Sequence, residues 1–469
     1  MQSLISEKGQ LLNLANIRAT PNEVAEASSS DAHHLTAIQW LVCAVACLGF
    51  AFDLYETLMM PLIMRPVLGA LGNLRPGMPS FNLWAGLLFF IPSAVGGVFG
   101  LLGGYLADLV GRRRVLVWSI LLYGASACAA SYSTSLHTFL VLRCATMIGV
   151  YVEYVAGVTW LAELFCDSKQ RETVLGFAQG FFSVGGLMVT GAYFLAVTYA
   201  ERLPTILARH EAWRYTLLSG TIPALPLLLV RPFLPESPFW RERKVRGMLK
   251  RPSVRELFRP ALLKTTVVVT LLAACSFALV YGAIQHTVRM IPGLPQVRNL
   301  APRQVEQRVS GVQLFQELGG LAGRVVFALF IVRIVTQRVR AWVFFLPSLA
   351  VFSWLYFFAA THSLGFVHLG IFVASLLFNG LHSLWGSYLP RVYPTHLRGT
   401  GDSFAMNIGG RTVGASSALL TTQLANVMPG AAASTQLAYA AAAVSLLACI
   451  VGLVASLWLC EPDGNRLPD

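Results

Sequence analysis

Charged side chains are scarce in this sequence. Only 12% of its 469 residues are Asp, Glu, Lys or Arg, whereas 55% are hydrophobic. A soluble protein carries about a quarter charged residues, because most of its surface faces water. The shortage excludes an ordinary soluble protein and predicts that much of the apolar surface faces lipid.

Motifs for nucleotide, metal and covalent chemistry are also missing. The chain has no Gly-x4-Gly-Lys-[Ser/Thr] loop, no His-Glu-x2-His pair and no nucleophile elbow. Its eight cysteines lie mostly inside apolar runs and show no metal-ligand spacing, so we expect buried free thiols. We therefore expect neither an enzyme nor a bound metal or cofactor.

Acidic residues are outnumbered by basic ones, and the net charge is +13. The basic residues are concentrated in short turns between apolar runs, so we expect a lipid bilayer rather than a nucleic acid as their partner. Residues 1–36 are polar, and we expect a disordered cytoplasmic tail without a cleavable signal peptide.

Apolar runs recur along the rest of the chain. A transmembrane helix needs about 20 predominantly apolar residues. Twelve segments satisfy this length, near 37–64, 81–106, 114–133, 138–161, 173–199, 213–233, 262–286, 307–333, 341–361, 366–389, 403–427 and 435–460. The sequence therefore predicts an all-α membrane protein with twelve transmembrane helices.

Most basic residues of the connections between segments lie in those that follow even-numbered segments. They include Arg112 to Arg114 after the second segment, Lys169 and Arg171 after the fourth, a long basic linker after the sixth, Arg338 and Arg340 after the eighth, and Arg391 and Arg398 after the tenth. By the positive-inside rule these connections are cytoplasmic. We therefore expect a multi-pass protein of the cell membrane, in bacteria the inner membrane, with both termini in the cytoplasm.

The two halves of the chain resemble each other. Arg112 and Arg338 occupy equivalent turns 226 residues apart (338 − 112), and Arg171 and Arg398 lie 227 apart (398 − 171). We expect an N-terminal six-helix bundle over 37–233, a basic cytoplasmic linker over 234–261, a C-terminal six-helix bundle over 262–460 and a cytoplasmic tail over 461–469. Parallel halves of this kind are typical of transporters, with the substrate site between them near mid-membrane.

A short polar turn joins the second and third segments. It reads Gly104-Tyr-Leu-Ala-Asp108-Leu-Val-Gly111-Arg112-Arg113-Arg114, with glycines that allow a sharp reversal. A basic turn that only fixes orientation is the simpler interpretation. The spacing Gly-x3-Asp-x2-Gly-Arg-Arg, however, resembles the loop between the second and third helices of major facilitator superfamily transporters. Leu109 departs from that pattern, which has a basic residue at this position.

Further motifs extend the resemblance. Leu161-Ala-Glu163-Leu-Phe-x5-Arg171 follows the fourth segment, Pro390-x3-Pro394-Thr-x2-Arg398 follows the tenth, and Pro235-Glu236-Ser237-Pro238 closes the sixth. Together they resemble the sugar-porter branch of the superfamily and the related metabolite–proton symporters. The resemblance implies two pseudo-symmetric six-helix bundles, with gating salt bridges on the cytoplasmic face formed by Gly104, Asp108, Gly111, Arg112, Arg113, Glu163, Arg171, Glu236, Arg338 and Arg398.

Ionisable residues inside membrane segments are costly, so they are candidate functional sites. Asp53 and Glu56 lie three residues apart on one face of the first segment, where mutual repulsion favours proton uptake. In sugar porters an acid on the first helix faces an arginine on the fourth, which implies that Asp53 accepts the proton and pairs with Arg143. A permanent structural ion pair, or a carboxylate hydrated near the outer end, is the alternative. Glu153 is a second proton site, a ligand for a cationic solute or a counter-ion to Arg143.

Polar and aromatic side chains in the second half are candidates for solute binding. Gln313, Gln316 and Glu317 share a helical face on the eighth segment, and the tenth carries Asn379, His382, Trp385 and Tyr388. Helix packing is the simpler alternative for each of the tenth-segment residues. Sugar porters have a glutamine-rich seventh helix, and its absence here argues against a sugar. Arg324 can pair with glutamates of the gate, and Arg411 can join the gate or hold an anionic solute.

These features predict a monomeric secondary transporter that moves a small organic metabolite by alternating access, coupled to proton symport. Proton-driven efflux of an amphipathic or cationic compound is the alternative. A transporter-like sensor is a third possibility, but the tails at 1–36 and after 460 are too short for an output domain.

Overall fold

The computed structural model describes residues 37–165, 168–230, 236–246, 253–334, 336–394 and 397–461. Helices make up almost all of this part of the chain, and the described residues contain no β-strand. Long apolar runs form helices in a membrane because only a helix satisfies all backbone hydrogen bonds within one segment.

Six predicted spans of the first half appear as helices. They are α3 (Ala37–Gly72), α4 (Pro79–Val110), α5 (Arg112–Ser131), α6 (Leu136–Leu164), α7 (Ser168–Tyr199), and the pair α8 (Ala212–Ser219) and α9 (Thr221–Val230). The short helix α10 (Pro238–Val245) lies in the predicted linker.

The second half repeats this pattern. Its spans are α11 (Pro260–Gly282), α13 (Pro302–Leu329), α14 (Gln337–Trp354) with η8 (Leu355–Ala359) and α15 (Ala360–His362), α16 (Leu364–Val392), the series α17 (Arg398–Ser403), η9 (Phe404–Gly414) and α18 (Ser416–Leu424), and α19 (Ala433–Ser456). The short α12 (Thr287–Met290) follows α11.

Hydropathy and length mark nine of the described helical spans as able to cross a membrane. The other three predicted spans contain breaks or charges. The sixth is divided into α8 and α9 at Gly220, and the eleventh passes from α-helix to π-helix in η9 and back. The eighth, α13, carries several charged side chains along its length. These features shorten the apolar runs without removing the helices, so the twelve-span prediction stands.

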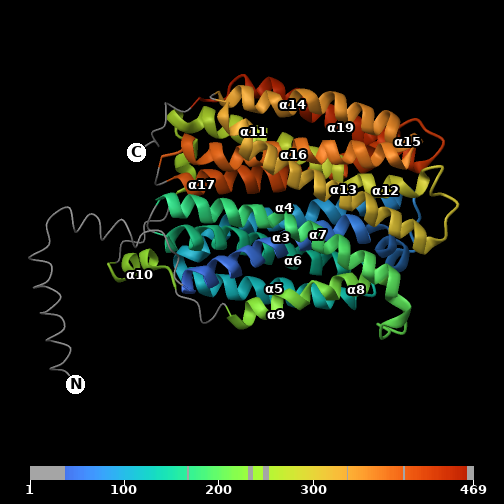
Figure 1. The fold of residues 1–469 in the computed structure, drawn as a ribbon, viewed down its shortest axis with the longest axis horizontal. Coiled ribbons are helices and arrows are strands. Elements are labelled where there is room, and N and C mark those ends of the chain that lie inside the picture. The colour runs from blue at the N-terminus through green and yellow to red at the C-terminus, as the bar shows by residue number, and fades with distance from the viewer. Residues whose placement is uncertain are drawn as a thin grey trace, which may run out of the picture. The chain divides into compact units, whose positions relative to one another are not determined.

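The helices pack into two groups that meet along two reciprocal contacts (Figure 1). Within the first half α4 and α5 pack on α6, and within the second half α13 packs on α16 while α14 packs on α19. Between the halves, the fifth span α7 packs on the second span of the other half, α13, and α4 packs on η9 and α18. This reciprocity is the pseudo-symmetry that the sequence repeats predict.

Candidate functional site

A buried ion pair joins the first and fourth spans. Arg143 on α6 donates from Nη1 to Oε2 of Glu56 on α3 at 3.1 Å, and from Nη2 to the Glu56 carbonyl oxygen at 2.9 Å. The Glu56 side chain is fully buried and that of Arg143 is 2% exposed. Gly220 leaves room for the carboxylate, because a Cβ there would lie 2.2 Å from Glu56 Oε1. Either partner alone would be a buried, unpaired charge.

The partner of Arg143 is not the predicted one. The resemblance to sugar porters implies Asp53 as the partner, whereas the structure places the carboxylate of Glu56, about one helical turn further along α3, on the arginine. Asp53 and Glu153 are also buried, at 2% and 1% exposure. Of the four predicted coupling residues, Glu56 and Arg143 form a direct ion pair.

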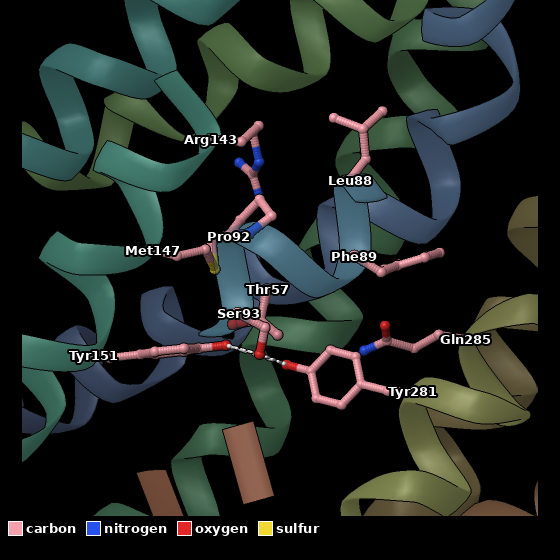
Figure 2. Close-up of a pocket in the computed structure, with 10 residues that line it drawn as sticks. All are labelled: Thr57, Leu88, Phe89, Pro92, Ser93, Arg143, Met147, Tyr151, Tyr281 and Gln285. Atoms are coloured by element: carbon pink, nitrogen blue, oxygen red, sulfur yellow. Dashed lines mark hydrogen bonds between the residues drawn. The ribbon is translucent and has the colours of Figure 1, made fainter. Parts of the chain in front are cut away.

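A small pocket lies beside this ion pair (Figure 2). Its apolar wall consists of Leu88, Phe89 and Pro92 on α4 and Met147 on α6. Arg143 is also part of the lining, and Figure 2 shows it at the top of the pocket. The remaining lining residues are Thr57, Ser93, Tyr151, Tyr281 and Gln285.

Three hydroxyl groups meet at the other end of the pocket (Figure 2). Ser93 Oγ lies 3.2 Å from Tyr281 Oη and 3.5 Å from Tyr151 Oη, and the two tyrosine oxygens are 3.1 Å apart. Ser93 and Tyr151 belong to the first half, and Tyr281 on α11 belongs to the second. The pocket is therefore located at the boundary between the two halves.

Arg411 adds a positive charge at this boundary. Its guanidinium lies over the ring of Tyr151, 3.9 Å from the centroid, and its Nη1 donates to Asn407 Oδ1 at 2.7 Å. Its carbonyl oxygen accepts a hydrogen bond from Ser93 Oγ at 2.9 Å. Arg411 is part of the π-helix η9, and π-helical segments are frequent at functional sites. A cation on an aromatic face suits either a gate between the halves or an anion site.

Glu317 marks the second boundary between the halves. Its Oε1 accepts hydrogen bonds from Gln313 Nε2 at 2.7 Å and Gln316 Nε2 at 3.0 Å, so the predicted face of α13 forms one cluster. A Cβ on Gly186 of α7 would lie 2.0 Å from Glu317 Oε2. The carboxylate therefore faces the other half across a position that only glycine fills without a clash.

The predicted residues of the tenth span divide into two groups. Asn379 Oδ1 accepts from Arg324 Nη2 at 3.1 Å, and the Arg324 guanidinium lies 5.4 Å from the ring centroid of Phe182 on α7, across the boundary. His382 packs edge-on to Phe277. These residues therefore lie on the side of the second half that includes the boundary with α7.

Trp385 and Tyr388 have partners within the second half. Trp385 Nε1 donates to Ser276 Oγ at 2.8 Å, and Tyr388 Oη donates to the Cys460 carbonyl oxygen at 2.7 Å. Both side chains are almost fully buried. Their contacts fit the helix-packing alternative.

Two glutamates hold the polar turn between α4 and α5. Arg112 Nη2 donates to Glu163 Oε1 at 2.8 Å. Glu236 Oε1 accepts the backbone N–H groups of Arg112 at 3.1 Å and Arg113 at 3.3 Å, which places an anion at the N-terminus of α5. Gly111 has a φ of +113° and sits against this carboxylate, so the turn favours glycine. The motif residues thus form one network.

The structure describes the side chains of only some of the other predicted gate residues. Gly104 on α4 faces Val155 of α6, and the backbone N–H of Arg338 donates to Glu461 Oε1 at 2.9 Å. Arg398 is the first residue of α17. The side chains of Asp108 and Arg171 lie outside the described residues.

At the opposite ends of the helices, polar contacts cross between the halves. Glu306 on α13 accepts from the guanidinium of Arg65 on α3 and from Tyr193 Oη on α7, the latter at 2.7 Å. Gln307 Nε2 donates to Thr198 Oγ1 at 3.2 Å, close to these residues in sequence. We call this set, formed by Arg65, Tyr193, Thr198, Glu306 and Gln307, the Arg65 cluster.

Sequence reasoning missed the Arg65 cluster and the three pocket hydroxyls. Arg143, Met147 and Tyr151 recur at steps of four, so they share one face of α6, and this spacing is the signal that identifies Tyr151. Ser93 and Tyr281 have no such signal, because they meet only when the halves pack together.

Comparisons with known proteins are consistent along the chain. A sequence profile of the Major Facilitator Superfamily matches residues 41–418. A probable 4-methylmuconolactone transporter of Cupriavidus pinatubonensis is 28% identical over 71% of this chain and 72% of its own. The sialic acid transporter NanX of Escherichia coli is 25% identical over 81% of this chain and 85% of its own.

A solved structure has the same fold. A D-xylose-proton symporter superposes with a TM-score of 0.68 at 16% identity, covering 91% of this chain and 99% of the symporter. The predicted twelve-span fold in two halves is thereby confirmed.

Proposed function

Since the chain belongs to the Major Facilitator Superfamily of transporters, we propose that it carries a small organic metabolite across the membrane by alternating access, coupled to proton symport. The observation that carries this proposal is the Glu56–Arg143 ion pair, which is buried and whose arginine lines a pocket between the halves. The names of the two relatives, which are transporters of a lactone and of sialic acid, support a small organic solute.

Glu56 is the proton acceptor in this proposal. A proton on its carboxylate removes the negative charge that Arg143 needs, so the pair opens and α3 is released from α6. Asp53 and Glu153, also buried, supply further proton sites along the same route. On the other boundary, Glu317 and its two glutamines contact the solute or the moving face of α7.

The two ends of the bundle open alternately. The Arg112–Glu163–Glu236 network lies at the end that the basic turns mark as cytoplasmic. The Arg65 cluster lies at the opposite end and joins the halves there. Opening one end requires its contacts to break while those at the other end hold.

Proton-driven efflux of a cationic or amphipathic compound is the second candidate. The buried acids Asp53, Glu153 and Glu317 favour it, because they can hold a cation. The ion pair between Glu56 and Arg143 favours import instead, since it leaves no net negative charge at the pocket wall.

Uptake into proteoliposomes under an imposed pH gradient tests the proposal. Labelled neutral, acidic and basic metabolites are offered with the lumen alkaline and then with no gradient. We expect accumulation of one class only when the gradient is present. Glu56→Gln should lose gradient-driven accumulation while it keeps exchange of internal for external solute. Accumulation by Glu56→Gln equal to that of the parent would refute the assignment of Glu56, and driven extrusion of cations would favour efflux.

A further inference from the structure

The guanidinium of Arg143 faces the pocket as well as Glu56. Arg143 is one of the lining residues, and Figure 2 shows its guanidinium directed towards the other lining side chains. Within the described residues, Arg143 contacts the carboxylate of Glu56 through Nη1. Its Nη2 donates to the backbone carbonyl oxygen of Glu56. A guanidinium presents five N–H donors in a planar fork that fits a carboxylate in two-point contact. Glu56 uses only part of that capacity.

A buried arginine needs an anion at every stage of the cycle. While Glu56 is ionised, it provides that anion at 3.1 Å. When Glu56 is protonated, Arg143 becomes an unpaired charge with 2% exposure at the wall of a pocket, which is unfavourable by several kcal/mol. A neutral solute leaves this charge unpaired, and a cationic solute adds repulsion. A solute with its own carboxylate restores the pairing.

The rest of the pocket indicates the shape of such a solute. Leu88, Phe89, Pro92 and Met147 offer apolar contact next to Arg143, and Phe89 adds the planar face of an aromatic ring. At the far end, the hydroxyl cluster offers donors and acceptors to a single polar substituent.

We propose that the transported solute is a small, flat organic carboxylate, and that its carboxylate replaces that of Glu56 on Arg143 once Glu56 has taken up a proton. This inference rests on the proposed function and adds the solute class. One proton and one anion enter together, so each cycle moves no net charge. The proton stays on Glu56 while the solute is bound and leaves when the carboxylate of Glu56 returns to Arg143.

The direction of the pH effect follows from this exchange. The charged and titratable groups around Glu56 are Arg143 and Cys144 on α6, Asp53 and Tyr55 on α3, and the pocket tyrosines Tyr151 and Tyr281. The segment after α8 faces Glu56 with Gly220, which has no side chain. Because binding of the carboxylate takes up a proton, its affinity rises as pH falls, by at most about tenfold per pH unit.

Binding to the purified full-length protein in lipid nanodiscs tests the proposal. The probes are benzoate and 4-hydroxybenzoate, their neutral amides, and the cations benzylamine and 4-hydroxybenzylamine, with sialic acid as a bulkier carboxylate. We expect a carboxylate to bind while its amide and amine counterparts do not. Its affinity should rise between about pH 8 and about pH 6 in the parent, and it should be constant with pH in Glu56→Gln, which mimics the protonated state.

The arginine is tested with a variant that keeps the pocket neutral. Arg143→Gln alone leaves the buried carboxylate of Glu56 unpaired and is expected to destabilise the protein. The double variant Glu56→Gln/Arg143→Gln avoids this loss of stability, so it is used to test binding. We expect it to lose carboxylate binding by about a hundredfold or more, as befits a charge-assisted two-point contact. The matched control is Glu211→Gln/Arg214→Gln, which neutralises both members of another Glu–Arg pair away from the pocket. It should bind as the parent does.

Three results would overturn the inference: preference for amides or amines, carboxylate binding that survives in the double variant, or no binding by any carboxylate of the panel. Proton-driven uptake of a neutral or cationic metabolite alongside any of them would leave the proposed function standing. Absence of gradient-driven uptake for all classes would refute the proposed function itself.

Discussion

At the scale of single residues, the proposed function depends on the burial of the ion pair between Glu56 and Arg143. Arg143 and Glu56 are both almost completely buried, and each satisfies the other. Removing a buried charge together with its partner costs little, whereas removing one partner strands the other. The pair is therefore stable while both groups are charged, and protonation of Glu56 leaves the charged guanidinium without its partner, which is the property that a proton switch requires.

This property can be measured without knowing the solute. Arg143→Gln should lower the stability of the purified protein by about 3 to 5 kcal/mol, because it leaves a buried carboxylate unpaired. Glu56→Gln/Arg143→Gln should recover most of that loss. The midpoint of thermal unfolding in detergent reports both changes. A double variant as unstable as Arg143→Gln would show that the carboxylate is not the source of the loss.

At the scale of helices, α7 makes close contacts with α3 of its own half and with α13 of the other half. Gly185 packs on α3 so closely that a Cβ would lie 1.7 Å from the Ala51 carbonyl oxygen, and Gly186 faces the carboxylate of Glu317 on α13. Gly191, on the same helix, has no atom within 4 Å of its Cβ position. The three glycines of α7 thus differ in the space around the Cβ position, which is smallest at Gly185 and largest at Gly191.

This difference in space predicts an order of stability. Gly185→Ala should be the most destabilising, by about 3 kcal/mol, because a backbone atom cannot move away. Gly186→Ala should cost less, since the Glu317 side chain can shift, and Gly191→Ala should be neutral or stabilise by about 1 kcal/mol through helix propensity. Thermal unfolding of the three variants measures this order. Equal effects for Gly185→Ala and Gly191→Ala would contradict the packing.

The same scale shows what could be predicted from the sequence. Twelve spans follow from local hydrophobicity, and even the interrupted spans at α8–α9 and η9 are helical as expected. The network of the Gly111 turn with Glu163 and Glu236 was expected because the motifs that contain these residues resemble the gating motifs of the superfamily. The choice of Glu56 over Asp53 was not, because it depends on how deep α3 sits against α6. Contacts between halves, such as Ser93 with Tyr281, depend on packing that no local pattern encodes.

At the scale of the whole molecule, the described polar contacts differ between the two ends. Those of the Arg65 cluster cross between the halves. Those around Arg112 join residues of the first half, and Glu461 binds the backbone of Gln337 and Arg338 within the second. The structure therefore has the halves tied together at the Arg65 end, and the proposed alternating access requires this end to separate.

A cross-link at the Arg65 end should stop the cycle. Thr198→Cys/Gln307→Cys, joined by a short thiol-specific linker, should reduce net uptake in proteoliposomes by about tenfold or more, because the halves can no longer part there. Reducible linkers allow the activity to be restored. The single variants, treated identically, serve as controls. Full uptake by the cross-linked protein would show that this end does not open.

The most direct test of the central claim follows protons and solute together. A transported solute is added to proteoliposomes that have no initial pH gradient, and the external pH is recorded with an indicator. We predict that the external medium becomes alkaline as solute enters in the parent, and that Glu56→Gln exchanges labelled solute without any pH change. Solute entry into parent proteoliposomes without alkalinisation, or an unchanged proton signal in Glu56→Gln, would contradict proton coupling through the Glu56–Arg143 pair.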